Sequence, residues 1–93
     1  MKIINATFFI KADKRSEFLS IIQPLIDASR LEKGNLSYDL YESIDKANQF
    51  TMIEHWENQK AIDSYNETPL FKKLFLALPE LSSDKVIVTV SDN

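Results

Sequence analysis

The sequence predicts an α+β domain of the ferredoxin-like type, with a four-stranded antiparallel sheet and the element order β-α-β-β-α-β. The first observation behind this prediction is the alternation of apolar and polar residues in four segments, 2–11, 35–42, 49–57 and 85–90. The second is helical spacing of apolar residues between these strands, in 13–33 and 58–78. The third is the short polar loop 43–48, which predicts an antiparallel hairpin.

The first strand is predicted to bury one face. Its even positions are all apolar, so we expect them to face a core: Ile4, Ala6, Phe8 and Ile10. Its odd positions include one amide, Asn5, among larger neighbours: Ile3, Thr7 and Phe9.

The first helix follows directly. Asp13 is a suitable N-cap, and Gly34 is expected to end the helix as a C-terminal cap. Pro24 interrupts the pattern and is expected to kink the helix. The apolar stripe predicted to face the sheet is Phe18, Ile21, Ile22, Leu25 and Ile26.

The hairpin alternates on both strands. On the first, Leu36, Tyr38 and Leu40 share one face, opposite Ser37, Asp39 and Tyr41. On the second, Phe50, Met52, Glu54 and Trp56 share a face opposite Thr51, Ile53, His55 and Glu57. The only tryptophan and the only histidine therefore lie on opposite sides of the sheet.

The second helical region is expected in two parts. Asn58 caps the first part, and Thr68-Pro69 breaks it, because the residue before proline avoids helical angles. The second part runs from Phe71 to Leu78, and Pro79 is expected to end it before the last strand, 85–90.

Composition restricts the function classes. The 93 residues suit a single domain, and a net charge of −3 without a basic stripe argues against nucleic acid. The absence of cysteine removes thiolate chemistry, and a single glycine excludes glycine-rich phosphate loops. Apolar runs are too short for a bilayer, and no signal peptide is visible, so we expect a cytoplasmic protein without membrane contact.

The predicted fold leaves one face of the sheet without helices. The first and third strands carry large apolar groups on both faces, and a bare apolar face usually marks an interface. We therefore expect a homodimer in which two sheets pack face to face.

Several short motifs resemble those of the antibiotic biosynthesis monooxygenase (ABM) family of dimeric α+β barrel proteins. They follow one another in family order: Glu32-Lys33-Gly34-Asn35, Tyr38-Asp39-Leu40-Tyr41, Phe50, Glu54-x-Trp56-Glu57, Ala61-Ile62 and Thr68-Pro69-Leu70-Phe71. The resemblance covers nearly the whole chain as a single domain, 1–93. It implies a fold and a pocket, since members differ in chemistry: some oxidise quinols or anthrones with dioxygen and no metal or flavin, others degrade heme or bind metabolites.

The chain departs from the family at positions that bear on chemistry. Tyr65 and Leu70 stand where many members have histidine. The anthrone-oxidising type places Asn four residues before the Trp and Tyr six after it, where this chain has Met52 and Ile62. The last helix lacks the axial histidine of heme-degrading members, which disfavours that activity.

Three residues are candidates for catalysis. The Trp56 indole is expected to stack on a flat substrate or donate its N–H, or simply to fill the core. The Asn5 amide is a candidate donor to an oxyanion, or an ordinary strand residue. The Tyr65 phenol is a candidate substrate contact, or a packing residue.

Other residues are expected to bind substrate: Tyr38, Met52, Glu54, Phe71 and Phe75. Glu54 is a candidate base, although bracing of the next helix through its backbone amides is favoured, and a structural role is favoured for His55. The function expected is a cofactor-independent monooxygenase acting on a small aromatic substrate, without a metal or bound cofactor. The alternative is a non-catalytic dimeric module of the same fold that binds a small metabolite.

Overall fold

The computed structural model describes residues 1–93 and contains the predicted elements in the predicted order. The second helical region is divided at Thr68 into two helices. The elements are β1 (Lys2–Ile10), the 3₁₀ turn η1 (Ala12–Lys14), α1 (Arg15–Ser29), β2 (Asn35–Glu42), β3 (Gln49–Trp56), α2 (Gln59–Asn66), α3 (Pro69–Leu81) and β4 (Ser82–Asp92).

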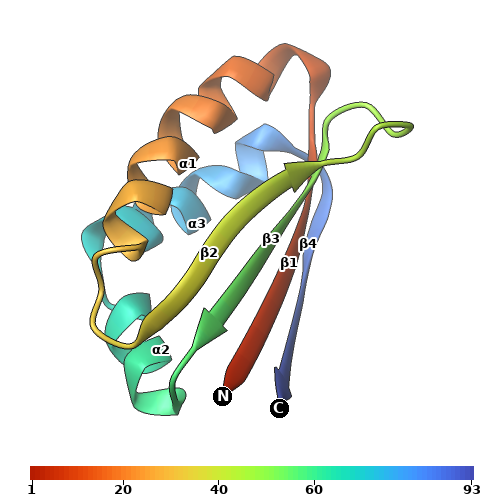
Figure 1. The fold of residues 1–93 in the computed structure, drawn as a ribbon. Coiled ribbons are helices and arrows are strands. Elements are labelled where there is room, and N and C mark those ends of the chain that lie inside the picture. The colour runs from red at the N-terminus through yellow and green to blue at the C-terminus, as the bar shows by residue number, and fades with distance from the viewer.

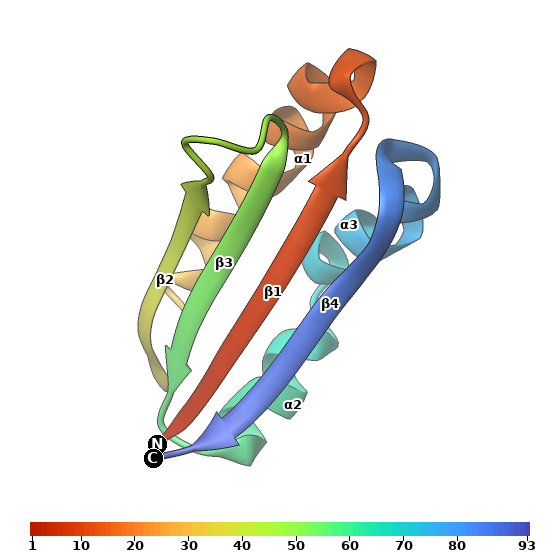
Figure 2. The ribbon, with the colours of Figure 1, turned by 90° about the vertical axis from the view of Figure 1, so that its right-hand side faces the viewer.

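The four strands form one antiparallel sheet in the order β2-β3-β1-β4, which confirms the ferredoxin-like prediction. All helices lie on one face of the sheet (Figure 1). The other face carries no helix, as the view onto it shows (Figure 2). No helix has the length and apolar character needed to span a lipid bilayer.

The core lies between the sheet and the helices. Its 17 apolar residues include the predicted inner face of β1 and most of the predicted stripe of α1. Three phenylalanine rings of the core pack against one another. The ring centroid of Phe18 lies 5.3 Å from that of Phe8 and 5.0 Å from that of Phe50. The alternation in the sequence therefore assigned the buried face of the first and third strands correctly.

Both ends of α1 differ from the prediction. Asp13 does not cap the helix, because residues 12–14 already turn as a 3₁₀ segment and lead into α1 without a side-chain cap. The helix ends at Ser29, so Gly34 is not its C-terminal cap. Gly34 has φ +90°, and a Cβ there would lie 2.6 Å from Cβ of Ala61. The glycine is therefore required by the turn into β2 and by the close approach of α2.

Neither internal proline stops its helix. Pro24 lies within α1 and Pro79 within α3, which continues to Leu81. Both prolines are on the exposed side, so the carbonyl that loses its intrahelical donor can be hydrated at little cost.

Two strand predictions also change: β4 is longer than 85–90, and an irregular pairing after Asn35 leaves Leu36 exposed rather than on the inner face with Tyr38.

Candidate active site

A cavity of about 270 Å³ lies between the sheet and the helices α2 and α3. Its lining is mainly apolar and contains no lysine, arginine or histidine. The lining residues are Ile4, Ala6, Phe8, Tyr38, Glu54, Gln59, Ile62, Tyr65, Asn66, Phe71, Leu74, Phe75, Val88 and Val90. A mostly apolar hollow with a few convergent polar groups is the usual form of a small-molecule site.

Glu54 is the one ionisable carboxyl in this lining. Strand alternation turns it inward together with Phe50, Met52 and Trp56, and β3 is an inner strand of the sheet, so the side chain is only 4% exposed. Its Oε1 accepts a hydrogen bond of 3.0 Å from Nε1 of Trp56. Burial raises the pKa of Glu54 to about 7, and the Trp56 hydrogen bond opposes this effect.

The second oxygen of Glu54 faces the cavity. No buried side-chain nitrogen or oxygen in the structure lacks a hydrogen-bond partner, yet Oε1 is the only oxygen of Glu54 with one. Oε2 must therefore reach accessible surface, and the surface beside Glu54 is the cavity. The predicted bracing of the next helix by Glu54 is wrong, since that helix is capped by Asn58, whose Oδ1 accepts from the backbone N–H of Ala61 at 2.9 Å.

Two tyrosines meet at the same wall. The hydroxyls of Tyr38 from β2 and Tyr65 from α2 are hydrogen-bonded to each other, and both side chains are buried. Burial raises the pKa of each phenol well above its ordinary value, and the negative charge of Glu54 adds to the effect. Both tyrosines therefore stay protonated at neutral pH and remain able to donate hydrogen bonds.

The segment from Asn58 to Pro69 explains how Tyr65 reaches this wall. After the Asn58 cap, residues Ile62 and Tyr65 share the inner side of α2 and are both buried. Pro69 starts α3 as its first residue, which brings Phe71 back against Tyr65 at a ring distance of 5.0 Å. Phe75 stacks on Phe71 at 4.6 Å and continues the aromatic wall.

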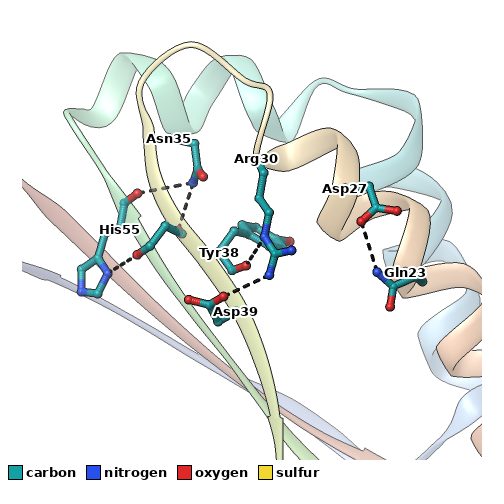
Figure 3. A network of polar contacts seen from close by, with 8 residues as sticks. Gln23, Asp27, Arg30, Asn35, Tyr38, Asp39 and His55 are labelled. Atoms are coloured by element: carbon teal, nitrogen blue, oxygen red, sulfur yellow. Dashed lines mark hydrogen bonds and ion pairs between the residues drawn. The ribbon is translucent and has the colours of Figure 1, made fainter.

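Arg30 fixes the strand that carries Tyr38. Its Nε donates to the backbone carbonyl of Tyr38 at 3.0 Å, and its Nη2 to Oδ1 of Asp39 at 3.0 Å (Figure 3). Because Arg30 directly follows α1, these contacts tie β2 to the helical layer. Tyr38 then points inward and Asp39 outward, as the alternation predicts.

The structure brings five of the eight predicted site residues into contact with the cavity: Tyr38, Glu54, Tyr65, Phe71 and Phe75. Trp56 and Met52 are fully buried and do not line it. Trp56 reaches the site through other residues: it donates to Glu54, packs against the Tyr65 ring with ring centroids 4.8 Å apart, and meets Tyr38 edge-on.

Asn5 does not join the other candidates. It is exposed and pairs with Ile53, which places it on the face of the sheet without helices. On the same face, Nδ1 of His55 lies 2.5 Å from the hydroxyl of Ser37 (Figure 3). Successive residues of a strand point to opposite faces of the sheet, so His55 points away from the face of Glu54 and Trp56. Asn5 pairs with Ile53 and therefore points to the same face as His55.

Sequence reasoning missed two polar lining residues, Gln59 and Asn66. They are three residues before and four after Ile62, so helical spacing places them on its side of α2. That spacing was the available signal. Val88 and Val90 of β4 were missed as well, and nothing but their alternation marked them.

No group of three or more His, Cys, Asp or Glu side chains is arranged to hold a metal ion.

Comparison with known proteins gives the family. The model of the family described as antibiotic biosynthesis monooxygenase matches residues 1–75. The chain belongs to the ABM family. This confirms the resemblance seen in the sequence motifs, and the match includes β1 to β3, α2 and the aromatic part of α3.

Individual ABM relatives cover most of the chain. "Putative monooxygenase YcnE" of Bacillus subtilis is 40% identical over 89% of this chain and 87% of its own length. "Putative monooxygenase Rv0793" of Mycobacterium tuberculosis is 32% identical over 94% and 85%. The solved structure of Rv0793 superposes with a TM-score of 0.92 over 99% of this chain and 93% of that chain. A crystal structure titled antibiotic biosynthesis monooxygenase, 26% identical, also gives 0.92, over 100% and 98%.

Proposed function

We propose that this ABM protein is a monooxygenase that oxidises a small, uncharged hydroxyaromatic, quinol- or anthrone-like, with dioxygen and without a bound cofactor. The observation that carries the proposal is Glu54, a buried carboxyl with a pKa of about 7 whose free oxygen faces an apolar cavity. The family and the names of the two relatives support the class of reaction.

Glu54 is assigned as the general base. A carboxyl with a pKa near neutral is partly ionised at working pH and is a stronger base than an exposed glutamate. It accepts the proton of an aromatic hydroxyl, or of the acidic carbon of an anthrone, through Oε2. The resulting anion is held in an apolar cavity, where it is less stabilised than in water and therefore gives up an electron more readily.

The electrons of the reaction come from the substrate. The deprotonated aromatic passes one electron to dioxygen, and the substrate radical and superoxide combine at a ring carbon to give a peroxide. The peroxide takes back the proton from Glu54. The carboxylate of Glu54 then removes the hydrogen of the oxygenated carbon as a proton while the O–O bond breaks, so that the carbonyl forms and the leaving hydroxide takes up that proton to become water. One oxygen atom ends in the product and one in water, so quinol plus dioxygen gives hydroxyquinone plus water.

Tyr38 and Tyr65 are assigned as hydrogen-bond donors to the developing oxyanion or peroxide. Their raised pKa values keep both phenols protonated while the substrate carries the negative charge. One of the two hydroxyl protons is used in the Tyr38–Tyr65 hydrogen bond. The other has the Ser29 hydroxyl beside it as an acceptor, since the proton of Ser29 goes to the Leu25 carbonyl. A ligand therefore receives this proton by replacing Ser29 as the acceptor.

The cavity limits the size and charge of the substrate. An enclosed cavity of about 150 Å³ can hold one benzene ring, so the 270 Å³ here holds about two fused rings. The lining residues Val88 and Val90 are exposed, so the cavity is open beside β4 and a third ring can extend out of it. No cationic side chain lines the cavity to balance an anionic substituent, and ionised Glu54 would repel one. An uncharged substrate fits both properties.

We also propose that two chains pair through the bare faces of their sheets (Figure 2). The outer positions of β1 and β3 are mostly apolar or uncharged, including Ile3, Phe9 and Ile53. Thr7 and Thr51 on this face satisfy each other through a hydroxyl contact of 3.1 Å. Such a face is suited to burial against a second copy.

The test is oxygen uptake with hydroquinones and anthrones of one to three rings. Uptake above the uncatalysed rate, with one atom of ¹⁸O from labelled dioxygen in the product, is expected for at least one of them. Glu54→Gln should remove this activity while the variant still binds the substrate. Uptake unchanged in Glu54→Gln would contradict the assignment of the base.

A catalytically silent binding module is the second candidate. The observation that favours it is that the only histidine, His55, lies on the outer face, so the cavity contains no imidazole. The two candidates separate on one pair of measurements. Saturable aromatic binding without oxygen uptake for any compound would support the module and contradict the monooxygenase.

A further inference from the structure

The indole N–H of Trp56 is fully committed. It donates to Oε1 of Glu54 at 3.0 Å, and an indole has one N–H and no acceptor. The group cannot therefore donate to a substrate or intermediate without giving up Glu54. Doing so would leave a buried carboxyl oxygen without its only protein donor.

The ring of Trp56 cannot reach the cavity either. It is 0% exposed and does not line the cavity. Tyr65 covers it at 4.8 Å with a ring tilt of 34°, and Tyr38 meets it edge-on at 6.5 Å and 85°. Rotation of the indole would displace both members of the tyrosine pair.

We propose that Trp56 is a positioning residue that holds one oxygen of Glu54 so that the other oxygen points into the cavity as the proton acceptor. The inference rests on the proposed function, because it assigns Glu54 as the base. It concerns the geometry of a pair two residues apart on one strand, whose side chains point to the same face. Trp56 then affects the reaction through Glu54 and makes no contact with the substrate.

The pair has a second consequence, for ionisation. A hydrogen bond donated to a carboxylate favours its charged form, so Trp56 limits the rise in pKa that burial causes. Without the indole N–H, the pKa of Glu54 should rise further. Glu54 would then be protonated, and inactive as a base, up to a higher pH. A tryptophan that only contacted the substrate would not have this effect.

The first experiment is Trp56→Phe, which keeps an aromatic ring and removes the N–H. The acidic limb of the kcat/KM–pH profile should move up by about 1 to 2 pH units, the range expected for losing a hydrogen bond to a charged group. KM measured above the new limb should change less than about twofold, since no substrate contact is removed. An acidic limb that does not move would overturn the proposal. A KM raised tenfold would overturn it as well, because it would show that Trp56 contacts the substrate.

The second experiment needs neither activity nor a change to Trp56. As the only tryptophan, it gives a single indole N–H signal in an ¹H–¹⁵N spectrum of the whole protein. We expect this signal to titrate with the same midpoint as the ¹³C signal of the Glu54 carboxyl, and the titration to vanish in Glu54→Gln. An indole signal that does not follow Glu54 would overturn the positioning role, even if the protein proves to be an oxygenase. A coupled titration without oxygen uptake would uphold the pair and contradict the proposed function alone.

Discussion

The two faces of the sheet place neighbouring residues of β3 in different surroundings. Glu54 faces the helices, is 4% exposed, and has a pKa raised to about 7 by burial. His55 faces the bare side, is half-buried, and contacts the hydroxyl of Ser37 (Figure 3). Histidine is the ordinary choice for proton transfer near neutral pH, yet here the cavity holds the glutamate. The comparison shows that position in the fold, more than residue type, selects the candidate base.

The largest expected effect separates these two residues by activity. Glu54→Gln should lower the rate of oxygen uptake by about 100- to 10,000-fold, the usual contribution of a general base. His55→Gln, on the opposite face, should change the rate by less than about threefold in the assembled protein. Initial rates at saturating substrate provide the measurement. A loss in His55→Gln as large as that in Glu54→Gln would break the distinction between the faces.

The next effect concerns stability and pH. The folded pKa of Glu54 lies above its unfolded value, so the folded state holds the proton more tightly between about pH 4.5 and 7. The contribution of protonated Glu54 to the free energy of unfolding is therefore fully present below the unfolded pKa of 4.5, and it is lost as the pH rises through about 7. The loss amounts to about 3 kcal/mol for a shift from 4.5 to about 7.

Urea unfolding at pH 5 and pH 8 measures this contribution. The decrease in unfolding free energy between the two values should be smaller in Glu54→Gln than in the wild type by about 2 to 3 kcal/mol, most of the full contribution. His55→Gln serves as the control on the outer face and should leave the Glu54 contribution in place. An equal pH dependence in wild type and Glu54→Gln would show that Glu54 is not buried as described.

A third prediction concerns the outer face alone. Ile53→Asp places a charge in the middle of that face, where its strand neighbours are Asn5 and Asp39. The variant should sediment as a monomer at micromolar concentration while its circular dichroism stays that of a folded protein. Ile53→Val, which keeps the face apolar, should remain a dimer. A monomeric wild-type protein would refute the proposed pairing.

The smallest effect compares the hydroxyl pairs of the two faces. Tyr38 and Tyr65 pair inside the core, while Thr7 and Thr51 pair on the bare face at 3.1 Å. Hydrogen bonds contribute about 1 kcal/mol each, and more where the partners are buried together. Double-mutant cycles with Tyr→Phe and Thr→Val should therefore give the larger coupling energy for the tyrosines. Equal couplings would mean that burial adds nothing to the inner pair.

Much of the fold followed from local sequence patterns. Strand alternation identified the inner faces of β1 and β3, including the opposite orientation of Glu54 and His55. The Thr68–Pro69 break correctly separated α2 from α3. The predicted ends of α1 and the predicted stop at Pro79 were wrong. Whether a proline ends a helix depends on whether the carbonyl that loses its donor meets solvent, and one-dimensional patterns do not show this.

The candidate site was predicted less completely. Alternation placed Glu54 and Trp56 on the same face, but the hydrogen bond between them depends on the side-chain rotamers, which the alternation does not show. For that reason the sequence offered Trp56 as a contact of the substrate and favoured a structural role for Glu54 at the start of the next helix. The Tyr38–Tyr65 contact joins residues 27 positions apart, which no local spacing could reveal. Asn5 shows the reverse case, since its own alternation already placed it on the other side.

The ionisation of Glu54 in the free wild-type protein tests the central claim most directly. Selective ¹³C labelling of glutamate carboxyls, with Glu54→Gln to assign the signal, would follow this one group across pH. The structure predicts a midpoint of about 7, because the carboxyl is buried against an apolar cavity with one hydrogen bond to its charged form. A midpoint at the ordinary value of an exposed glutamate would contradict the buried base and the function built on it.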